Sequence, residues 1–172
     1  MRSAADFVGA DVWSKVDANW RALRERIRQA GYVGARDGAN CQPLAPFREY
    51  FADGVTNEAI GNSRIAQFGI SRFAALLAKI ERRNDVSDLV VEMDDDFSRG
   101  WPRRGYIFVA TLEDADAVRG WFAAIQPDFI LPAGRNGPWV KARAIRIEDV
   151  KIAPNHQLWA LHWDHDLDGE IG

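Results

Sequence analysis

The hydrophobic pattern of this chain changes its period close to residue 85. Before that point, apolar residues recur every three or four positions, as they do along one face of a helix. After it come short runs of β-branched and aromatic residues, which are typical of strands. Strands and helices do not alternate in a sustained series. The order therefore predicts an α+β fold, in which N-terminal helices precede a mostly antiparallel sheet with helices on one face.

In the first half, the spacing predicts two long helices, over residues 11–30 and 71–83, and two short ones, over 46–52 and 57–68. Ser71 is expected to cap the second long helix, because serine side chains accept hydrogen bonds from the first helical amides. Closely spaced glycines and prolines predict a loop over residues 31–46.

In the second half, the predicted order is β-β-α-β-β. The main strands are expected over 86–93, 104–111, 139–152 (one long strand or two) and 157–163, with 129–131 as an additional short strand. The helix after the second strand is predicted to be capped by Thr111, with Asp114 in a capping box, and to end at Pro127. Within the final strand, side-chain alternation places Trp159, Leu161 and Trp163 on one face and His162 on the other.

The length of 172 residues favours a single domain spanning 1–172, with residues 164–172 as a flexible acidic tail. A lone cysteine excludes an internal disulfide. The sequence contains neither a signal-peptide pattern nor the roughly 18 apolar residues that cross a bilayer, so we expect a cytoplasmic protein without membrane contact. The net charge of −3 argues against nucleic-acid binding, which needs a strongly basic surface.

Tryptophan is unusually frequent, and five of the seven tryptophans follow residue 100. Tryptophan is enriched at binding hot spots because it offers a large rigid surface with one polar group. The predicted binding residues are those near strand ends and loops, together with two adjacent arginines: Trp101, Arg103, Arg104, Trp139, Trp159 and Trp163.

A thiol-dependent active site is one hypothesis for catalysis. Cys41 precedes a predicted helix, whose N-terminus lowers a thiol pKa, and His156 or His162 follows much later near the last strand. No recognised signature surrounds Cys41. A small, chemically inert residue is the more common role of a lone cysteine.

A metal site near the C-terminus is the second chemical hypothesis. Its candidate ligands are the imidazoles and carboxylates that follow one another there: His162, Asp164, His165, Asp166 and Asp168. The spacing of the three aspartates, followed by Gly169, matches the first half of an EF-hand loop but lacks the later bidentate glutamate. We therefore expect an acidic tail here, with neither a bound metal nor any other cofactor.

The sequence favours a non-catalytic binding domain, similar in general terms to immunity and antitoxin proteins, that grips a protein partner through a tryptophan-rich sheet surface. One alternative is a small-molecule-binding domain with an aromatic pocket. The other is an enzyme that uses Cys41 or the histidines at 156, 162 and 165. These alternatives remain open, as does the oligomeric state.

Overall fold

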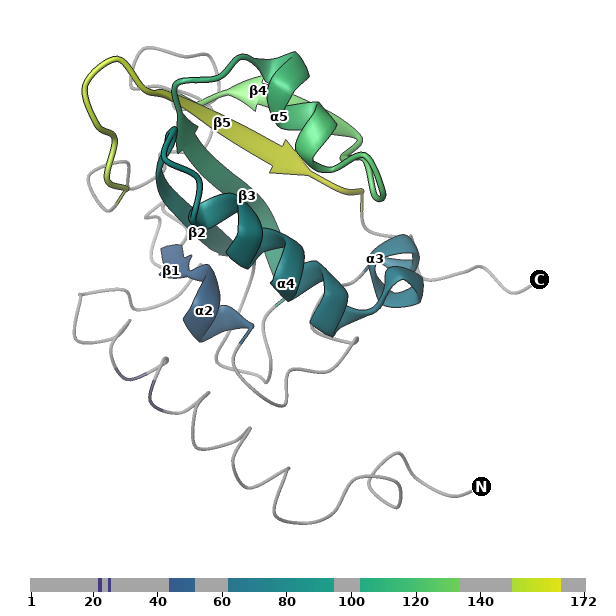
Figure 1. Cartoon of the computed structure of the whole chain (residues 1–172). Coiled ribbons are helices and arrows are strands. Elements are labelled where there is room, and N and C mark those ends of the chain that lie inside the picture. The colour runs from purple at the N-terminus through teal and green to yellow at the C-terminus, as the bar shows by residue number, and fades with distance from the viewer. Residues whose placement is uncertain are drawn as a thin grey trace, which may run out of the picture.

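The computed structural model of the chain describes residues 22, 25, 44–51, 62–94, 103–133 and 150–164. Its elements follow one another as shown in Figure 1. They are β1 (Leu44–Pro46), α2 (Phe47–Tyr50), α3 (Ser63–Phe68), α4 (Ile70–Glu81), β2 (Val86–Asp94), β3 (Arg103–Thr111), α5 (Ala115–Trp121), β4 (Phe129–Pro132) and β5 (Gln157–His162).

The five strands form one sheet in the order β1-β2-β3-β5-β4, and every neighbouring pair is antiparallel. The predicted α+β fold with a mostly antiparallel sheet is thereby confirmed. The predicted strand order is confirmed in part, because β4, expected only as a short strand, is the described strand that precedes β5. The last strand in sequence, β5, lies between β3 and β4, so β4 borders only β5 among the described strands (Figure 1). The loop predicted over 31–46 was wrong at its end, because residues 44–46 pair with β2 as β1.

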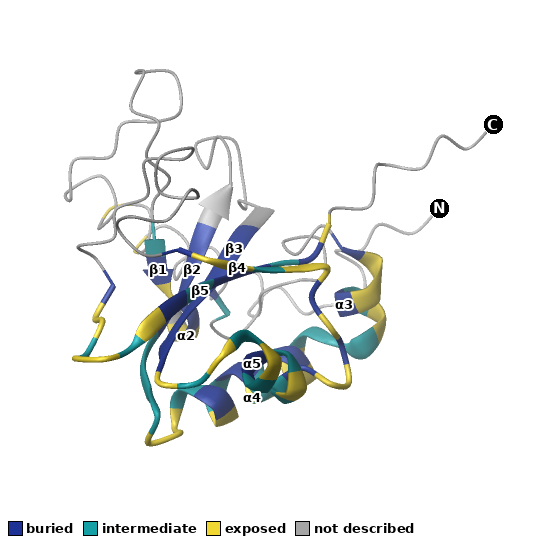
Figure 2. Cartoon of the chain, turned by 90° about the horizontal axis from the view of Figure 1, so that it is seen from above, coloured by how far each residue is buried: buried dark blue, intermediate teal, exposed yellow. Residues whose placement is uncertain are grey.

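All described helices pack against one face of the sheet, which we call the helix-covered face (Figure 2). α4 buries Phe73, Leu77 and Ile80 here, in accordance with its helical spacing. Trp163 fills the middle of this core with none of its surface exposed. Its ring meets Phe73 and Phe122 edge-on, at centroid distances of 5.5 and 5.4 Å, and its indole N–H donates to the Ile125 carbonyl at 3.2 Å.

The opposite face of the sheet, which we call the second face, is also buried. Its core combines alternate residues of three central strands with two residues from flanking segments: Val90, Tyr106, Phe108, Ala110, Leu158, Ala160, Ala133 and Val150. Leu158 and Ala160 belong to this face, whereas Trp159 and Leu161 belong to the helix-covered face. The alternation predicted for the final strand is therefore confirmed.

The structure corrects two predicted helix caps. α4 begins at Ile70, after Gly69 with a φ of 97°, so Ser71 lies inside the helix. The cap of α5 is Asp114, whose carboxylate accepts from the Ala117 amide at 2.9 Å. Thr111 instead donates its hydroxyl to the Asp85 carbonyl at 2.7 Å. A cap depends on local φ and ψ angles, which residue type alone does not determine.

Of the strand predicted over 139–152, only residues 150–152 are described, and these are not in a strand. They and Ala153 are held by side chains of β2. The Asp88 carboxylate accepts from the Lys151 amide at 2.7 Å, and the Ser87 hydroxyl accepts from the Ala153 amide at 3.2 Å. Side-chain acceptors here replace the backbone pairing that a strand would have used.

The helix predicted over 11–30 lies outside the described residues except for Ala22 and Glu25, which are both helical and exposed. The tail predicted for 164–172 lies outside them except for Asp164. Within the ranges described, no helix is long and apolar enough to cross a bilayer.

Candidate functional site

Several predicted site residues lie outside the described part of the chain. They are Cys41, Trp101, Trp139, His165, Asp166 and Asp168. Arg103 and Arg104 contribute their backbone to β3, opposite Asp94 and Met93, but their side chains are not described. The roles assigned to these residues remain predictions.

The two described tryptophans of the predicted binding set point into the helix-covered face. Trp163 is completely buried, and Trp159 is half-buried with its indole N–H donating to the Glu113 carbonyl at 2.9 Å. Both indole N–H groups are thus used within the fold, as is usual for buried tryptophans. Neither ring is available as an open binding platform in this conformation.

The structure does not bring His156 and His162 together. His156 lies in the turn before β5, with its Nδ1 3.1 Å from the Pro154 carbonyl oxygen, whereas His162 is the last residue of that strand. Six steps along the chain, through the extended residues of β5, separate the two histidines by about 20 Å. The described residues contain no group of three or more histidine, cysteine, aspartate or glutamate side chains arranged to hold a metal ion.

His162 instead belongs to a row of side chains on the second face that crosses the sheet. Glu92 of β2 lies opposite Gly105 and Tyr106 of β3, where the register between these two strands shifts. On the other side of β3, Ile107 pairs with Leu161 of β5, so the next position along each strand brings Tyr106 beside His162. The rings of Tyr106 and His162 lie 4.5 Å apart at 32°. We call Glu92, Tyr106 and His162 the polar row.

The carboxylate in the polar row is wholly buried, with 0% of Glu92 exposed. Its position depends on the register shift, where β3 has one residue more than β2 and forms a bulge. A Cβ on Gly105 would stand 2.8 Å from Glu92 Oε1 and 3.1 Å from the Glu92 carbonyl oxygen, so only glycine leaves room for this side chain. The predicted site residues did not include Glu92, although it lies within the strand predicted over 86–93.

Past the end of β5, the His162 Nδ1 lies 3.5 Å from an Asp164 carboxylate oxygen. About 15% of the His162 side chain and 65% of the Asp164 side chain are exposed. The polar row therefore runs from a buried carboxylate to a histidine–carboxylate pair at the surface. Two donors from the predicted metal set meet here, which is fewer than a closed zinc site uses.

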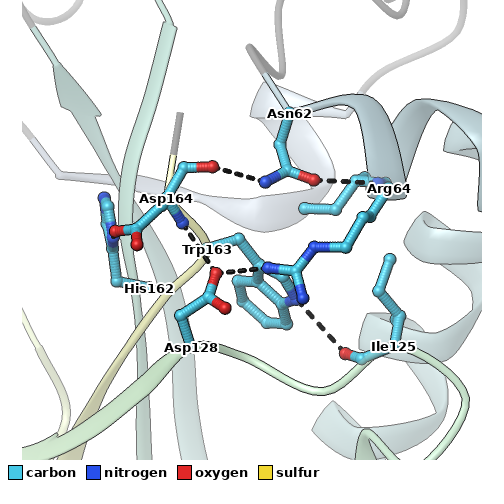
Figure 3. Close-up of polar contacts among 8 residues, drawn as sticks. Asn62, Arg64, Ile125, Asp128, His162, Trp163 and Asp164 are labelled. Carbon is cyan, nitrogen blue, oxygen red and sulfur yellow. Dashed lines mark hydrogen bonds and ion pairs between the residues drawn. The ribbon is translucent and has the colours of Figure 1, made fainter. Parts of the chain in front are cut away.

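Asp164 is held by a set of polar contacts that we call the clasp: Asn62, Arg64, Asp128 and Asp164 (Figure 3). Asn62 caps α3 by accepting from the Ile65 amide at 3.1 Å, and its side-chain amide donates to the Asp164 carbonyl. Asp128 accepts from the Asp164 amide at 2.9 Å and forms an ion pair with Arg64. The clasp joins the start of α3, the start of β4 and the end of β5.

Beside the clasp lie two exposed apolar side chains of β4. Phe129 is 48% exposed and Leu131 is 37% exposed. Phe129 pairs with His162 and Leu131 with Ala160, so both project from the second face. We call Phe129, Leu131, His162 and Asp164 the β4 margin. The sequence predicted this strand, but only the sheet order reveals that it borders a single described neighbour.

The described ion pair with shifted pKa values lies elsewhere, at the start of β2. Two hydrogen bonds from Arg83, at 2.9 and 2.7 Å, lower the pKa of Asp85, and the same contacts raise the pKa of Arg83. The Arg83 guanidinium also lies 4.2 Å from the centre of the Trp121 ring. These contacts fasten the turn after α4 to the end of α5 and leave the β4 margin untouched.

Comparison with known proteins finds a match between residues 19–161 and one family model, described as the uncharacterized protein YfbO family. The match covers every described element except β5, of which it includes all but the last residue. No curated protein and no solved structure matches the chain.

Proposed function

The chain belongs to the uncharacterized YfbO family, and we propose that it is a non-catalytic protein-binding domain, of the immunity or antitoxin kind, whose partner docks on the β4 margin. The observation that carries this proposal is the exposure of Phe129 and Leu131 side by side on one face of a strand. The sequence predicted a tryptophan-rich sheet surface, whereas the surface proposed here lies on β4, the strand that pairs with β5.

The composition of the β4 margin supports a protein partner. Interface hot spots combine a large apolar or aromatic anchor with surrounding polar groups that exclude water. Phe129 offers the anchor, and Asp164 and His162 offer charged and hydrogen-bonding groups beside it. The clasp fixes the backbone at this place, so that binding requires little ordering of the surface.

Site-specific photo-crosslinking in the cells that naturally make the protein tests the proposal. A photoreactive phenylalanine analogue replaces Phe129, and the matched control carries it at Lys79, an exposed position on α4. We expect a single protein adduct from position 129, lost when Leu131 is also changed to glutamate, and no such adduct from position 79. Identical adducts from both positions, or none from position 129, would contradict the proposal.

The polar row favours a second candidate function, the binding of a small molecule with a cationic group. A buried carboxylate near two adjacent aromatic rings, those of Tyr106 and His162, is a combination that recognises amines and guanidinium groups. A panel of amines should then raise the melting temperature of the wild-type chain but not that of Glu92→Gln. Equal shifts for the two proteins would exclude this site.

The enzyme hypotheses remain as predictions, with Cys41 outside the described residues. A Cys41→Ala variant with full biological activity would exclude thiol catalysis. Metal analysis of the purified chain that finds no stoichiometric zinc or calcium would exclude the metal-dependent alternative.

A further inference from the structure

The backbone of β4 offers a second means of binding at the β4 margin. The Ala133 amide donates to the Leu158 carbonyl at 2.8 Å, which fixes the phase of the ladder between β4 and β5. In an antiparallel ladder, alternate residues direct both backbone groups to the same neighbour. Phe129 and Leu131 therefore direct their backbone N–H and C=O groups to β5. Ile130 directs its N–H and C=O away from β5, toward the outer edge.

The other residues of the strand limit how this edge can be used. Pro132 is in phase with Ile130 but has no N–H, so it offers only a carbonyl. Proline on the outer side of an edge strand is one of the ways in which proteins restrict uncontrolled pairing. The edge of β4 thus presents one donor, at Ile130, and two acceptors, at Ile130 and Pro132. A short added strand can use all three.

The side chains on both sides of Ile130 suit an extended apolar segment. Phe129 and Leu131 flank Ile130 on the second face, where they would contact alternate side chains of an added strand. Ile130 itself packs toward the helix-covered face and keeps the strand in place. Protein surfaces that recognise peptides by strand addition combine these two elements, backbone pairing and pockets for alternate side chains.

The charge at the Phe129 end selects the kind of segment. Asp128 and Asp164 lie together there, and the described cation beside them, Arg64, is already paired with Asp128. The Asp164 carboxylate is largely exposed and faces His162. A partner with a basic residue at this end gains a favourable interaction, whereas an acidic one is repelled.

We infer that the partner binds by adding an extended segment to β4, with apolar side chains at alternate positions and a lysine or arginine beside Asp164. This inference rests on the proposed function, because it specifies how a protein partner occupies the β4 margin. The added segment pairs with Ile130, extends the sheet by one strand and covers Phe129 and Leu131.

Peptides selected from a random displayed library against the intact chain provide the probe. We expect the enriched peptides to alternate apolar residues and to carry a basic residue near one end. N-methyl groups are then introduced at one peptide residue at a time, and binding is measured by fluorescence anisotropy. At every second position the N-methyl group should weaken binding about tenfold, because it removes a backbone donor. At the positions in between, the dissociation constant should stay within about threefold of that of the unmethylated peptide. Phe129→Glu should abolish binding, while Lys79→Glu should not.

Failure of strand addition is distinguishable from failure of the proposed function. If position 129 gives photo-crosslinks but the N-methyl scan shows no two-residue period, the proposed protein-binding function stands and strand addition is overturned. A library that yields no enriched peptides would also contradict strand addition. The absence of crosslinks from position 129 would contradict both strand addition and the proposed protein-binding function. A stable dimer in sedimentation that Phe129→Glu dissociates would overturn it too, because a second copy would then occupy β4.

Discussion

Neighbouring residues of β5 face two different environments. Leu161, and Trp163 just past the end of the strand, lie among the apolar side chains of the helices, whereas the His162 ring lies against that of Tyr106 in a row that also contains the Glu92 carboxylate. Both faces are buried, but among the described residues the buried carboxylate, Glu92, lies on the second face. A buried charge costs free energy unless it is paired, so such groups are retained where they have a structural or functional task.

The two faces of the sheet have different roles. The helix-covered face stabilises the fold by apolar contact, and its largest fully buried side chain is Trp163. The second face also positions polar groups, and it continues to the surface at Phe129 and Leu131. Substitutions on the helix-covered face should therefore change stability, and those at the β4 margin should change binding.

The largest effect is expected from Trp163→Ala on the helix-covered face. It removes two edge-on ring contacts and the hydrogen bond to Ile125, and it leaves a cavity in the core. The free energy of unfolding should fall by about 3–5 kcal/mol, measured by urea denaturation. Trp121→Ala, at a half-buried ring beside Arg83, should cost clearly less. Equal losses for both would contradict the central position given to Trp163.

On the second face, Gly105→Ala should be the most sensitive single-methyl change. The new Cβ would overlap the buried Glu92 carboxylate and approach its carbonyl oxygen. We expect a loss of about 1–3 kcal/mol in the free energy of unfolding.

Gly120→Ala is the matched control for this change, since a Cβ there would meet no atom within 4 Å and the residue lies in α5. It should gain about 0.5–1 kcal/mol, because alanine is the better helix former. If the two alanine variants had the same stability, the tight fit at Glu92 would be refuted.

Between the two faces, Asn62→Ala tests the clasp. It removes the cap of α3 and the contact with Asp164, which should lower the free energy of unfolding by about 1–2 kcal/mol. Amide hydrogen exchange at Asp164 should accelerate in this variant. Unchanged exchange there would mean that Asp128 alone holds the end of β5.

The smallest effect concerns Arg83 and Asp85. Because Arg83 lowers the pKa of Asp85 below its ordinary value of 3.8, the pair stabilises the fold above that pH and loses its contribution as the pH falls below it. Asp85→Asn should cost no more than about 1 kcal/mol at pH 7, because the pair is partly exposed. In an acid denaturation series, the difference from wild type should shrink as the pH falls from 3.8 through the lowered pKa of Asp85 and then disappear. If the difference in the free energy of unfolding persisted at the lowest pH, it would not come from the ionisation of Asp85.

The parts of the fold that the sequence predicts well are those in which periodicity extends over many residues. α4, β2, β3 and β5 lie within a few residues of their predicted positions. β1 has three residues, too few for any alternation to be recognised, and it exists because β2 offers it a partner.

The candidate site was less predictable for a physical reason. The polar row depends on β5 lying between β3 and β4 and on a bulge at Gly105, and both are properties of strand pairing. Alternation along 86–93 places Glu92 in phase with Val90, and this is the signal by which a buried carboxylate could have been suspected. Phe129 likewise looks like an ordinary strand residue until the sheet order leaves β4 with one described neighbour.

The central place of β5 also affects how the chain folds during its synthesis. A nascent chain that has not yet released residues 157–163 from the ribosome lacks the strand that separates β3 from β4 and the ring that fills the helix-covered core. The contact between Asn62 and Asp164 likewise closes a separation of 102 residues. Contacts of such long range slow folding, because chain entropy is lost before they form. The five-stranded sheet therefore cannot close until residues 157–163 have left the ribosome, and until then the apolar residues of β3 and β4 are exposed to aggregation.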